Sequence, residues 1–333
     1  MRTIAFMNQK GGVGKTTCAV NIASCLARWR HKVLLIDMDP QANLTVHVNI
    51  SADLKEKTIY SVLSGDITLA EAIREVEGEY FDFIPSTMDL SGAEVELAGM
   101  LGREQLMKKA LKKLTEDGAK YDYILVDCPP SLGLLVLNAL TAVNEVYIPI
   151  QAQFFALHGL SRLIEVVKLV KERLNESIEI TGIIPCMFDT RTNLSREVVE
   201  ELKSHFGKLV FNSVIHQNIR LAEAPSYGKT IFRYAASSTG AEDFDKLCRE
   251  IRRREKRDER ETPAGESAEP ATTPEALIES AAALANAVRA AAMDAAKILV
   301  VPKSDENPSA ESGQKSDSPD SGGTNAELER KVG

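Results

Sequence analysis

Short apolar runs alternate along most of the chain with segments whose apolar residues recur at helical spacing. Uninterrupted apolar runs of about four to eight residues are typical of strands buried on both faces of a parallel sheet. The segments between them predict helices that cover both faces of that sheet. The pattern therefore indicates an α/β fold with a mostly parallel, twisted sheet. Strands are expected at residues 3–8, 33–36, 81–85, 123–126, 143–150, 178–184 and 209–215, and helices at 17–28, 160–174 and 241–253.

The composition changes after Arg254, where the chain becomes rich in Ser, Pro, Glu, Asp and Gly. Such segments bury too little apolar surface to fold alone. We therefore expect an ordered domain at residues 1–254 and an acidic, mostly disordered tail at residues 255–333. Within the tail, residues 275–301 are rich in alanine, which favours a helix. This helix is either transient or a docking element for a partner, and the sequence leaves both interpretations open.

For judging whether the protein can bind nucleic acid, the distribution of charge along the chain matters more than the net charge. The formal net charge is -8, from 48 acidic and 40 basic residues. Of these, 16 acidic and 9 basic residues fall at positions 255–333, which leaves 32 and 31 for residues 1–254. The expected domain is therefore almost neutral, and a local basic patch on it can still attract phosphate. The acidic total does not exclude a nucleic-acid partner.

The chain shows no sign of a membrane or secretory destination. No run of about 18 apolar residues indicates a transmembrane helix, and the apolar start is interrupted too early, at Asn8, for a signal peptide. The five cysteines contain no Cys-x-x-Cys pair, which favours small packing residues in a reducing compartment. We expect a cytoplasmic protein.

A glycine-rich segment, Lys-Gly-Gly-Val-Gly-Lys-Thr-Thr at residues 10–17, lies between the first predicted strand and the first helix. Its glycines let successive backbone N–H groups point at phosphate oxygens, and the following helix adds the positive end of its dipole. Lys15 is expected to reach the β- and γ-phosphates of a nucleotide, and the Thr16 hydroxyl to bind Mg²⁺. A glycine-rich turn without a ligand is disfavoured because Gly-Lys-Thr follows a strand. The predicted phosphate-binding residues are Lys10, Gly11, Gly12, Val13, Gly14, Lys15, Thr16 and Thr17.

The segment departs from the ordinary P-loop pattern at its start. Gln9 stands where that pattern has glycine, and Lys10 adds a second lysine. Because Lys15 already serves the chain's own nucleotide, Lys10 is expected to reach the nucleotide of a second subunit.

Carboxylates follow two further apolar strands. Asp37 and Asp39 end the run at residues 33–36, and Asp127 ends the run at residues 123–126. The carboxyl ends of parallel strands meet at one edge of a sheet, beside the P-loop. Asp37 and Asp39 are two residues apart, and residues so spaced in an extended strand share one face. Asp127 suits the acid that orients Mg²⁺ in P-loop nucleotide hydrolases.

These segments and three others together resemble the ParA/Soj family of deviant Walker-A partition ATPases, which has a P-loop NTPase fold. The likeness covers roughly residues 1–250, occurs in the family's order and favours its chromosomal branch. The matching stretches are NQKGGVGKTT (8–17), VLLIDMDPQAN (33–43), YDYILVDCPPSLGLL (121–135), NALTA (138–142), DTRTNL (189–194) and RLAEAPSYGKTI (220–231).

The resemblance implies an ATP hydrolase with slow basal turnover. Lys10 would cross to the partner's nucleotide, while Lys15 would hold this subunit's phosphates. Asp39 would position the attacking water with support from Asp37, and the metal ligands would be Thr16, Asp39 and Asp127. The family binds ATP and Mg²⁺, forms a homodimer on ATP and binds DNA without sequence preference. A ParB/Spo0J-like partner stimulates hydrolysis and releases the dimer. These properties imply a nucleoid-associated protein.

For the DNA surface, the resemblance points to Arg191 and Arg220, while Lys229 and Arg233 are better explained as solvated charges. One departure touches this surface. His216-Gln217 replaces the family's usual Pro-Arg, which removes a positive charge from it.

Three alternatives remain open. A MinD-like spatial regulator would need an amphipathic membrane anchor, but the apolar residues of this tail are mostly alanine. A reductase of the nitrogenase-iron-protein type would need cysteines that bridge a cluster between subunits, and Cys128 has no obvious companion. An adaptor that only binds nucleotide is disfavoured by the presence of Lys15, Asp39 and Asp127.

Overall fold

A computed structural model describes residues 1–51, 57–153, 159–261, 273 and 275–283. Their strands form one sheet in the order β3-β4-β2-β5-β1-β6-β7-β8. Neighbouring strands are parallel except for β3 and β4, which confirms the predicted mostly parallel α/β sheet. The strands are β1 (Arg2–Phe6), β2 (Val33–Asp37), β3 (Arg74–Glu75), β4 (Asp82–Ile84), β5 (Tyr123–Asp127), β6 (Glu145–Gln151), β7 (Glu179–Phe188) and β8 (Ile215–His216).

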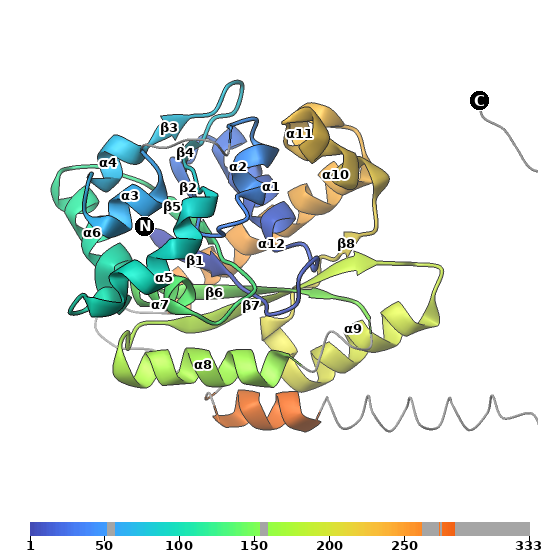
Figure 1. Cartoon of the computed structure of the whole chain (residues 1–333). Coiled ribbons are helices and arrows are strands. Elements are labelled where there is room, and N and C mark those ends of the chain that lie inside the picture. The colour runs from blue at the N-terminus through green and yellow to red at the C-terminus, as the bar shows by residue number, and fades with distance from the viewer. Residues whose placement is uncertain (52–56, 154–158, 262–272, 274, 284–333) are drawn as a thin grey trace, which may run out of the picture. The chain divides into compact units, whose positions relative to one another are not determined.

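Helices cover both faces of this sheet (Figure 1). None of those in the described part of the chain is long and apolar enough to cross a membrane. The α-helices are α1 (Lys15–Arg28), α2 (Asn43–His47), α3 (Ile59–Ser64), α4 (Leu69–Ala72), α5 (Ala93–Glu96), α6 (Leu106–Glu116), α7 (Leu134–Ala142), α8 (Leu160–Arg173), α9 (Asn193–Phe206), α10 (Ile219–Glu223), α11 (Ile231–Tyr234) and α12 (Thr239–Glu261).

Two apolar cores lie on opposite faces of the sheet. Successive side chains of a strand point to opposite faces. In β1, Ala5 therefore packs with residues of α3, α6, α7 and α8, while Ile4 and Phe6 pack with residues of α1, α11 and α12. All five residues of β2 and of β5 are buried, which explains their uninterrupted apolar sequences. The central strands are thereby fixed, and their carboxyl ends are held rigidly beside the loop that leads into α1.

The prediction of a strand at residues 209–215 is wrong for most of its length. Strand β8 begins only at Ile215, and Val210 makes a single parallel bridge with Ile183. Between them, the backbone N–H groups of Asn212 and Ser213 donate to the Glu250 carboxylate, at 2.9 and 2.8 Å. A side chain from α12 therefore replaces the strand partner that would have extended the ladder.

The carboxyl-terminal part of the chain contains two helical pieces. Helix α12 runs through Arg254 to Glu261, so the residues just after the expected domain boundary are helical rather than part of a disordered tail. Residues 275–283 form a second helix. Its Leu277 and Ala281 are buried in the core cluster that includes α8, and Glu275 pairs with Lys168 of α8 at 2.6 Å. The rest of the alanine-rich segment predicted at residues 275–301 lies outside the described residues.

Candidate nucleotide-binding site

The loop between β1 and α1 has the backbone that phosphate binding requires. Gly12 and Gly14 have φ angles of 73° and 95°, which side chains rarely allow. Gly14 precedes the first turn of α1, and no side chain caps its free N–H groups. Beside Gly11 and Gly12, an added Cβ would meet no atom within 4 Å. The loop is thus an open cradle of N–H groups at a helix N-terminus, which suits a phosphate chain.

The first turn of α1 carries the two side chains expected to act on that chain. Lys15 is 8% exposed, and its Nζ lies 3.5 Å from the Lys10 carbonyl oxygen. The Thr16 hydroxyl donates to Asp127 Oδ2 at 2.6 Å. Asp127 Oδ1 is buried without a hydrogen-bond partner. Burial, followed by the charge of nearby Asp37, raises the pKa of Asp127 well above its ordinary value. A cation held at Thr16, with its bound water, would satisfy this oxygen and the buried charge.

Asp37 and Asp39 are held at the end of β2 by local hydrogen bonds. Asp37 Oδ2 accepts from the backbone N–H and the hydroxyl of Thr45, at 2.9 and 2.7 Å, and its Oδ1 accepts from the Asp39 N–H. Burial raises the pKa of Asp37 to about 7. Asp39 is 8% exposed and its Oδ1 accepts from the Gln41 N–H. Asp37 is therefore a fixed support, while Asp39 lies nearer the surface of the site.

The sheet brings the predicted acids together. Asp37 and Asp127 are direct neighbours in the register of β2 and β5, and Phe6 of β1 is the neighbour of Asp127 on its other side. The charges of Asp37 and Asp39 both act on Asp127. Among the described residues, no group of three or more His, Cys, Asp or Glu side chains could hold a metal ion alone. The assignment of Thr16, Asp39 and Asp127 to Mg²⁺ stays a prediction, in which the nucleotide phosphates would supply further ligands.

Lys10 lies apart from the inner site. It is exposed, and its Nζ donates to Gln151 Oε1 at the end of β6, at 3.1 Å. Asn8 holds its backbone, because Asn8 Oδ1 accepts from the Lys10 N–H while the Asn8 amide donates to the Pro149 carbonyl. The ammonium group of Lys10 is thus available at the surface while its backbone is fixed.

Sequence reasoning missed three side chains that organise this site: Asn8, Thr45 and Gln151. Asn8 begins the first stretch that resembles the family, but nothing in its spacing shows that it anchors Lys10. The contact of Thr45 with Asp37 and that of Gln151 with Lys10 cross from one element to another. Only the fold brings these pairs together.

The two arginines predicted to bind DNA lie on the surface, and both are ion-paired. Arg191 is 83% exposed at its side chain and pairs with Asp189 at 2.8 Å. Arg220 is 59% exposed and pairs with Glu223 at 2.9 Å. His216, at the predicted departure, pairs through Nδ1 with Asp243 of α12 at 2.9 Å. The assignment of Arg191 and Arg220 to DNA stays a prediction.

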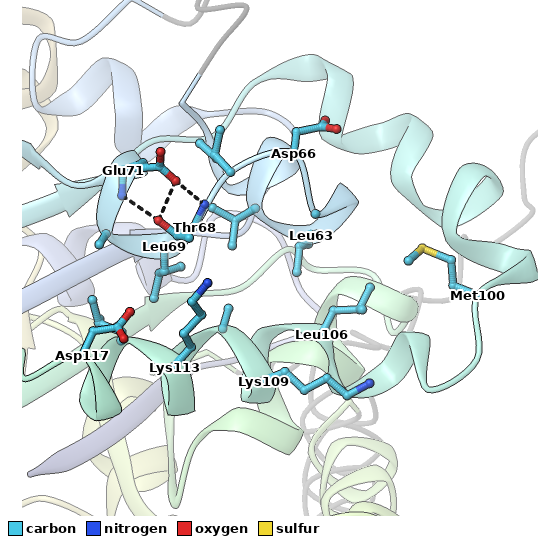
Figure 2. A pocket seen from close by; sticks show the side chains of 16 residues that line it. Leu63, Asp66, Thr68, Leu69, Glu71, Met100, Leu106, Lys109, Lys113 and Asp117 are labelled. Carbon is cyan, nitrogen blue, oxygen red and sulfur yellow. Dashed lines mark hydrogen bonds between the residues drawn. The ribbon is translucent and has the colours of Figure 1, made fainter.

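A pocket of about 370 Å³ lies elsewhere, between α3, α4 and α6. Figure 2 shows Lys113 and Asp117 of the α6 region on the side of the pocket opposite Thr68 and Glu71, which form the hydrogen-bonded cap of α4. No P-loop residue and none of the three acids lines this pocket, so it is separate from the candidate site. All five cysteines are buried, including Cys128.

The fold and this site define a P-loop nucleotide hydrolase. A family model described as an AAA domain matches residues 1–180. The sporulation initiation inhibitor protein Soj of Bacillus subtilis is 46% identical over 75% of this chain and 98% of its own length. The chromosome partitioning protein ParA of Myxococcus xanthus is 46% identical over 76% and 89%. The chain belongs to the Soj/ParA family of chromosome-partitioning ATPases.

A solved structure agrees in fold. Cobyrinic acid a,c-diamide synthase from Mycobacterium smegmatis, with a bound ATP analogue and magnesium, is 32% identical. The match has a TM-score of 0.67 and covers 77% of this chain and 96% of that one. Both partition relatives are more similar in sequence than this synthase.

Proposed function

We propose that this protein hydrolyses ATP with Mg²⁺ in order to switch its own binding to DNA during chromosome or plasmid partition. One arrangement carries the proposal. The open glycine-rich loop leads directly into Thr16, which donates to Asp127, and Asp127 Oδ1 is buried without a hydrogen-bond partner. Membership of the Soj/ParA family supports the biological role. We expect weak basal turnover, because such a switch must persist long enough to act.

The residues divide the chemistry between them. Bound Mg²⁺ supplies positive charge against the transferred phosphoryl group. Lys15 adds a second positive charge from a buried position, where electrostatic interactions are stronger than in water. Asp39, the less enclosed of the two acids after β2, orients the attacking water, and Asp37 fixes the backbone N–H of Asp39. Asp127 accepts from the Thr16 hydroxyl and would help to hold Mg²⁺ beside it.

Dimerisation is assigned to Lys10. Among the described residues, its exposed side chain donates a hydrogen bond to Gln151 Oε1, an uncharged acceptor that a phosphate can replace at little cost. In a two-fold dimer, Lys10 of each subunit would reach the partner's nucleotide, so that each nucleotide is held by both chains. Loss of the γ-phosphate would remove that contact and loosen the dimer.

The dimer would bind DNA without sequence preference, through arginine and lysine contacts to phosphate. Two copies of one basic surface, joined in a dimer, raise the affinity well above that of either alone. A ParB/Spo0J-like partner would then stimulate hydrolysis and release the dimer. In this proposal the protein is cytoplasmic and associated with the nucleoid.

Two lysine variants test the division between binding and dimerisation. Lys15→Ala should weaken binding of a fluorescent ATP analogue by about 10- to 150-fold, because hydrogen bonds to charged groups contribute about 1.5–3 kcal/mol. Lys10→Ala should keep that affinity but stay monomeric with ATP in sedimentation experiments. ATP-dependent dimers of Lys10→Ala would refute the assignment of Lys10 to the partner's nucleotide. Unchanged nucleotide affinity in Lys15→Ala would refute the proposed ATP site.

A further inference from the structure

A second concentration of positive charge lies where the end of α9, the 3₁₀ turn at Gly207–Leu209 and α12 meet. A pocket of about 600 Å³ is lined there by five basic side chains and one acid. We call it the basic pocket, and its charged residues are Lys203, Lys208, Arg253, Arg254, Arg257 and Glu250. None of the predicted nucleotide or DNA residues lines it, so it is distinct from the site described above.

The one acid in this pocket is paired with Arg254 and is also held by the turn before β8. Glu250 Oε1 accepts from the Asn212 N–H and from Arg254, both at 2.9 Å, and Oε2 accepts from the N–H and hydroxyl of Ser213. Its carboxylate is therefore committed to the backbone turn before β8. Within the described part of the chain, the ammonium groups of Lys203 and Lys208 lie within ion-pair distance of no carboxylate, and the Arg253 guanidinium donates to the Arg249 carbonyl. Among the described residues, the positive charges of Lys203, Lys208 and Arg253 thus converge on the pocket without a carboxylate paired to them.

Arg254 gives the pocket a rigid wall. Its guanidinium lies 3.9 Å from the centre of the Phe211 ring, and it also donates to the carbonyl oxygens of Leu209 and Val210. Elsewhere on α12, Arg249 is engaged in a pair on the helix itself, with Asp245. A cation at the end of α9 also suits that helix's dipole, but the dipole accounts only for Lys203 and for none of the residues from α12.

The contrast with the predicted DNA residues is informative. Arg191 and Arg220 would each have to leave a carboxylate of this chain before binding phosphate. Among the described residues, Lys203, Lys208 and Arg253 have no such carboxylate to leave. The cost of binding an anion is therefore lower in the basic pocket than at either predicted arginine.

We propose that the basic pocket binds the phosphodiester backbone of DNA and is a second contact surface of the partition switch. This inference rests on the proposed DNA binding. The pocket is lined by five basic residues and by no aromatic side chain, so it suits the phosphates of a nucleic acid better than its bases. Regularly spaced phosphates suit several converging cations, and guanidinium groups can donate two hydrogen bonds to one phosphate.

The chain's own acidic tail is the competing occupant. Residues 262–333 carry 12 acidic and 6 basic side chains, so their negative charges are sparse and interrupted by positive ones. A DNA strand presents one charge about every 3.4 Å without interruption. Charge complementarity therefore favours the nucleic-acid backbone over the tail.

The test replaces Lys203, Lys208 and Arg253 with glutamine in the full-length chain and leaves the structural Arg254 in place. A matched variant replaces Lys108, Lys112 and Lys120, which are exposed on or beside α6, so that the same charge is removed elsewhere. Binding to random-sequence duplex DNA with ATP is measured by fluorescence anisotropy over a range of salt concentrations. The salt slope should fall by about 0.9 for each phosphate that the variant no longer neutralises. The pocket variant should bind DNA about tenfold or more weakly, while the matched variant and the ATP-dependent dimer stay unchanged.

Equal affinity and slope in the wild type and the pocket variant would overturn the inference and leave the proposed function standing. No ATP-dependent DNA binding by the wild type would overturn both. A synthetic peptide of residues 302–333 is the second probe. If it binds the wild type but not the pocket variant, while DNA affinity is equal in both, the pocket takes an acidic peptide and the inference is wrong.

Discussion

Asp127 shows how much of the site depends on single atoms. One of its oxygens accepts from Thr16 and the other is buried without a partner. An unpaired buried carboxylate oxygen is costly, so a cation bound beside Thr16 would relieve that cost. The charge of Lys15, from α1, acts on the same carboxylate. Together they explain why the loop sequence carries both Lys15 and Thr16.

At the same scale, His47 connects two functional segments. It lies in α2, shortly after Asp39, and its Nε2 is 3.1 Å from the carbonyl oxygen of Lys229. Burial lowers the pKa of His47 to about 4. Neutral His47, which follows Asp37 and Asp39 in the sequence, is therefore hydrogen-bonded to the backbone of Lys229, in the segment after Arg220.

This histidine predicts a pH dependence of stability. Above pH 6.5 His47 is neutral in both the folded and the unfolded chain; between pH 6.5 and about 4 only the unfolded chain gains a proton. The free energy of unfolding should therefore fall by up to about 3 kcal/mol across that window through His47 alone. His47→Gln should flatten that part of the profile in urea titrations. Parallel profiles for the wild type and His47→Gln would contradict this account.

Among the elements, α2 and the turn before α11 are in unusually close contact. Gly228 has a φ angle of 61°, and a Cβ built on it would lie 2.5 Å from the Cβ of Asn49. The glycine is thus required both by its backbone conformation and by the approach of the segment that follows α2. Together with His47, this contact ties the segment after β2 to the segment that carries Arg220.

Gly228→Ala should therefore lower stability by about 1–3 kcal/mol, through strain in φ and the clash with Asn49. Gly118→Ala is the matched control, since Gly118 has a φ angle of 92° but no atom within 4 Å of an added Cβ. Thermal unfolding should show a clearly larger loss for Gly228→Ala. Adding Asn49→Gly to Gly228→Ala should recover the part of the stability loss that comes from the steric clash. Equal losses at the two glycines would mean that the contact with Asn49 is unimportant.

The elements also show what a sequence can and cannot predict. The P-loop and the acids at residues 37, 39 and 127 are recognisable because each depends on local spacing at the end of an apolar strand. The strand predicted at residues 209–215 fails because Glu250, which is distant in sequence, takes the N–H groups that a strand would have used. The basic pocket is invisible in the sequence for the same reason, because α9 and α12 meet only in the fold.

On the scale of the whole molecule, the chain continues beyond the part shared with its relatives. Soj of Bacillus subtilis matches over 75% of this chain but 98% of its own length. Within the remainder, residues 275–283 pack on the domain through Leu277, Ala281 and the pair of Glu275 with Lys168. The helix at residues 275–283 is thus attached to α8. Helix α8 follows Gln151 in the sequence, and Gln151 is the hydrogen-bond partner of Lys10.

Leu277→Asp should release this helix, because it places a charge where the side chain is now 6% exposed. Hydrogen exchange at residues 275–283 should accelerate to the rate of an unfolded segment, with little change in β1 or β5. Glu279→Ala, at a less buried position of the same helix, should leave the protection intact. Unchanged protection in Leu277→Asp would show that the helix is held by contacts other than this one.

The central claim is that ATP controls binding to DNA, and the measurement that tests it most directly uses Asp39→Ala. Without Asp39 the attacking water is not positioned, so ATP should remain bound and the dimer should persist. Binding to random-sequence DNA should then be tight with ATP and absent with ADP, and it should weaken steeply as salt rises. Equal binding with both nucleotides, or none with ATP despite a demonstrated dimer, would contradict the account.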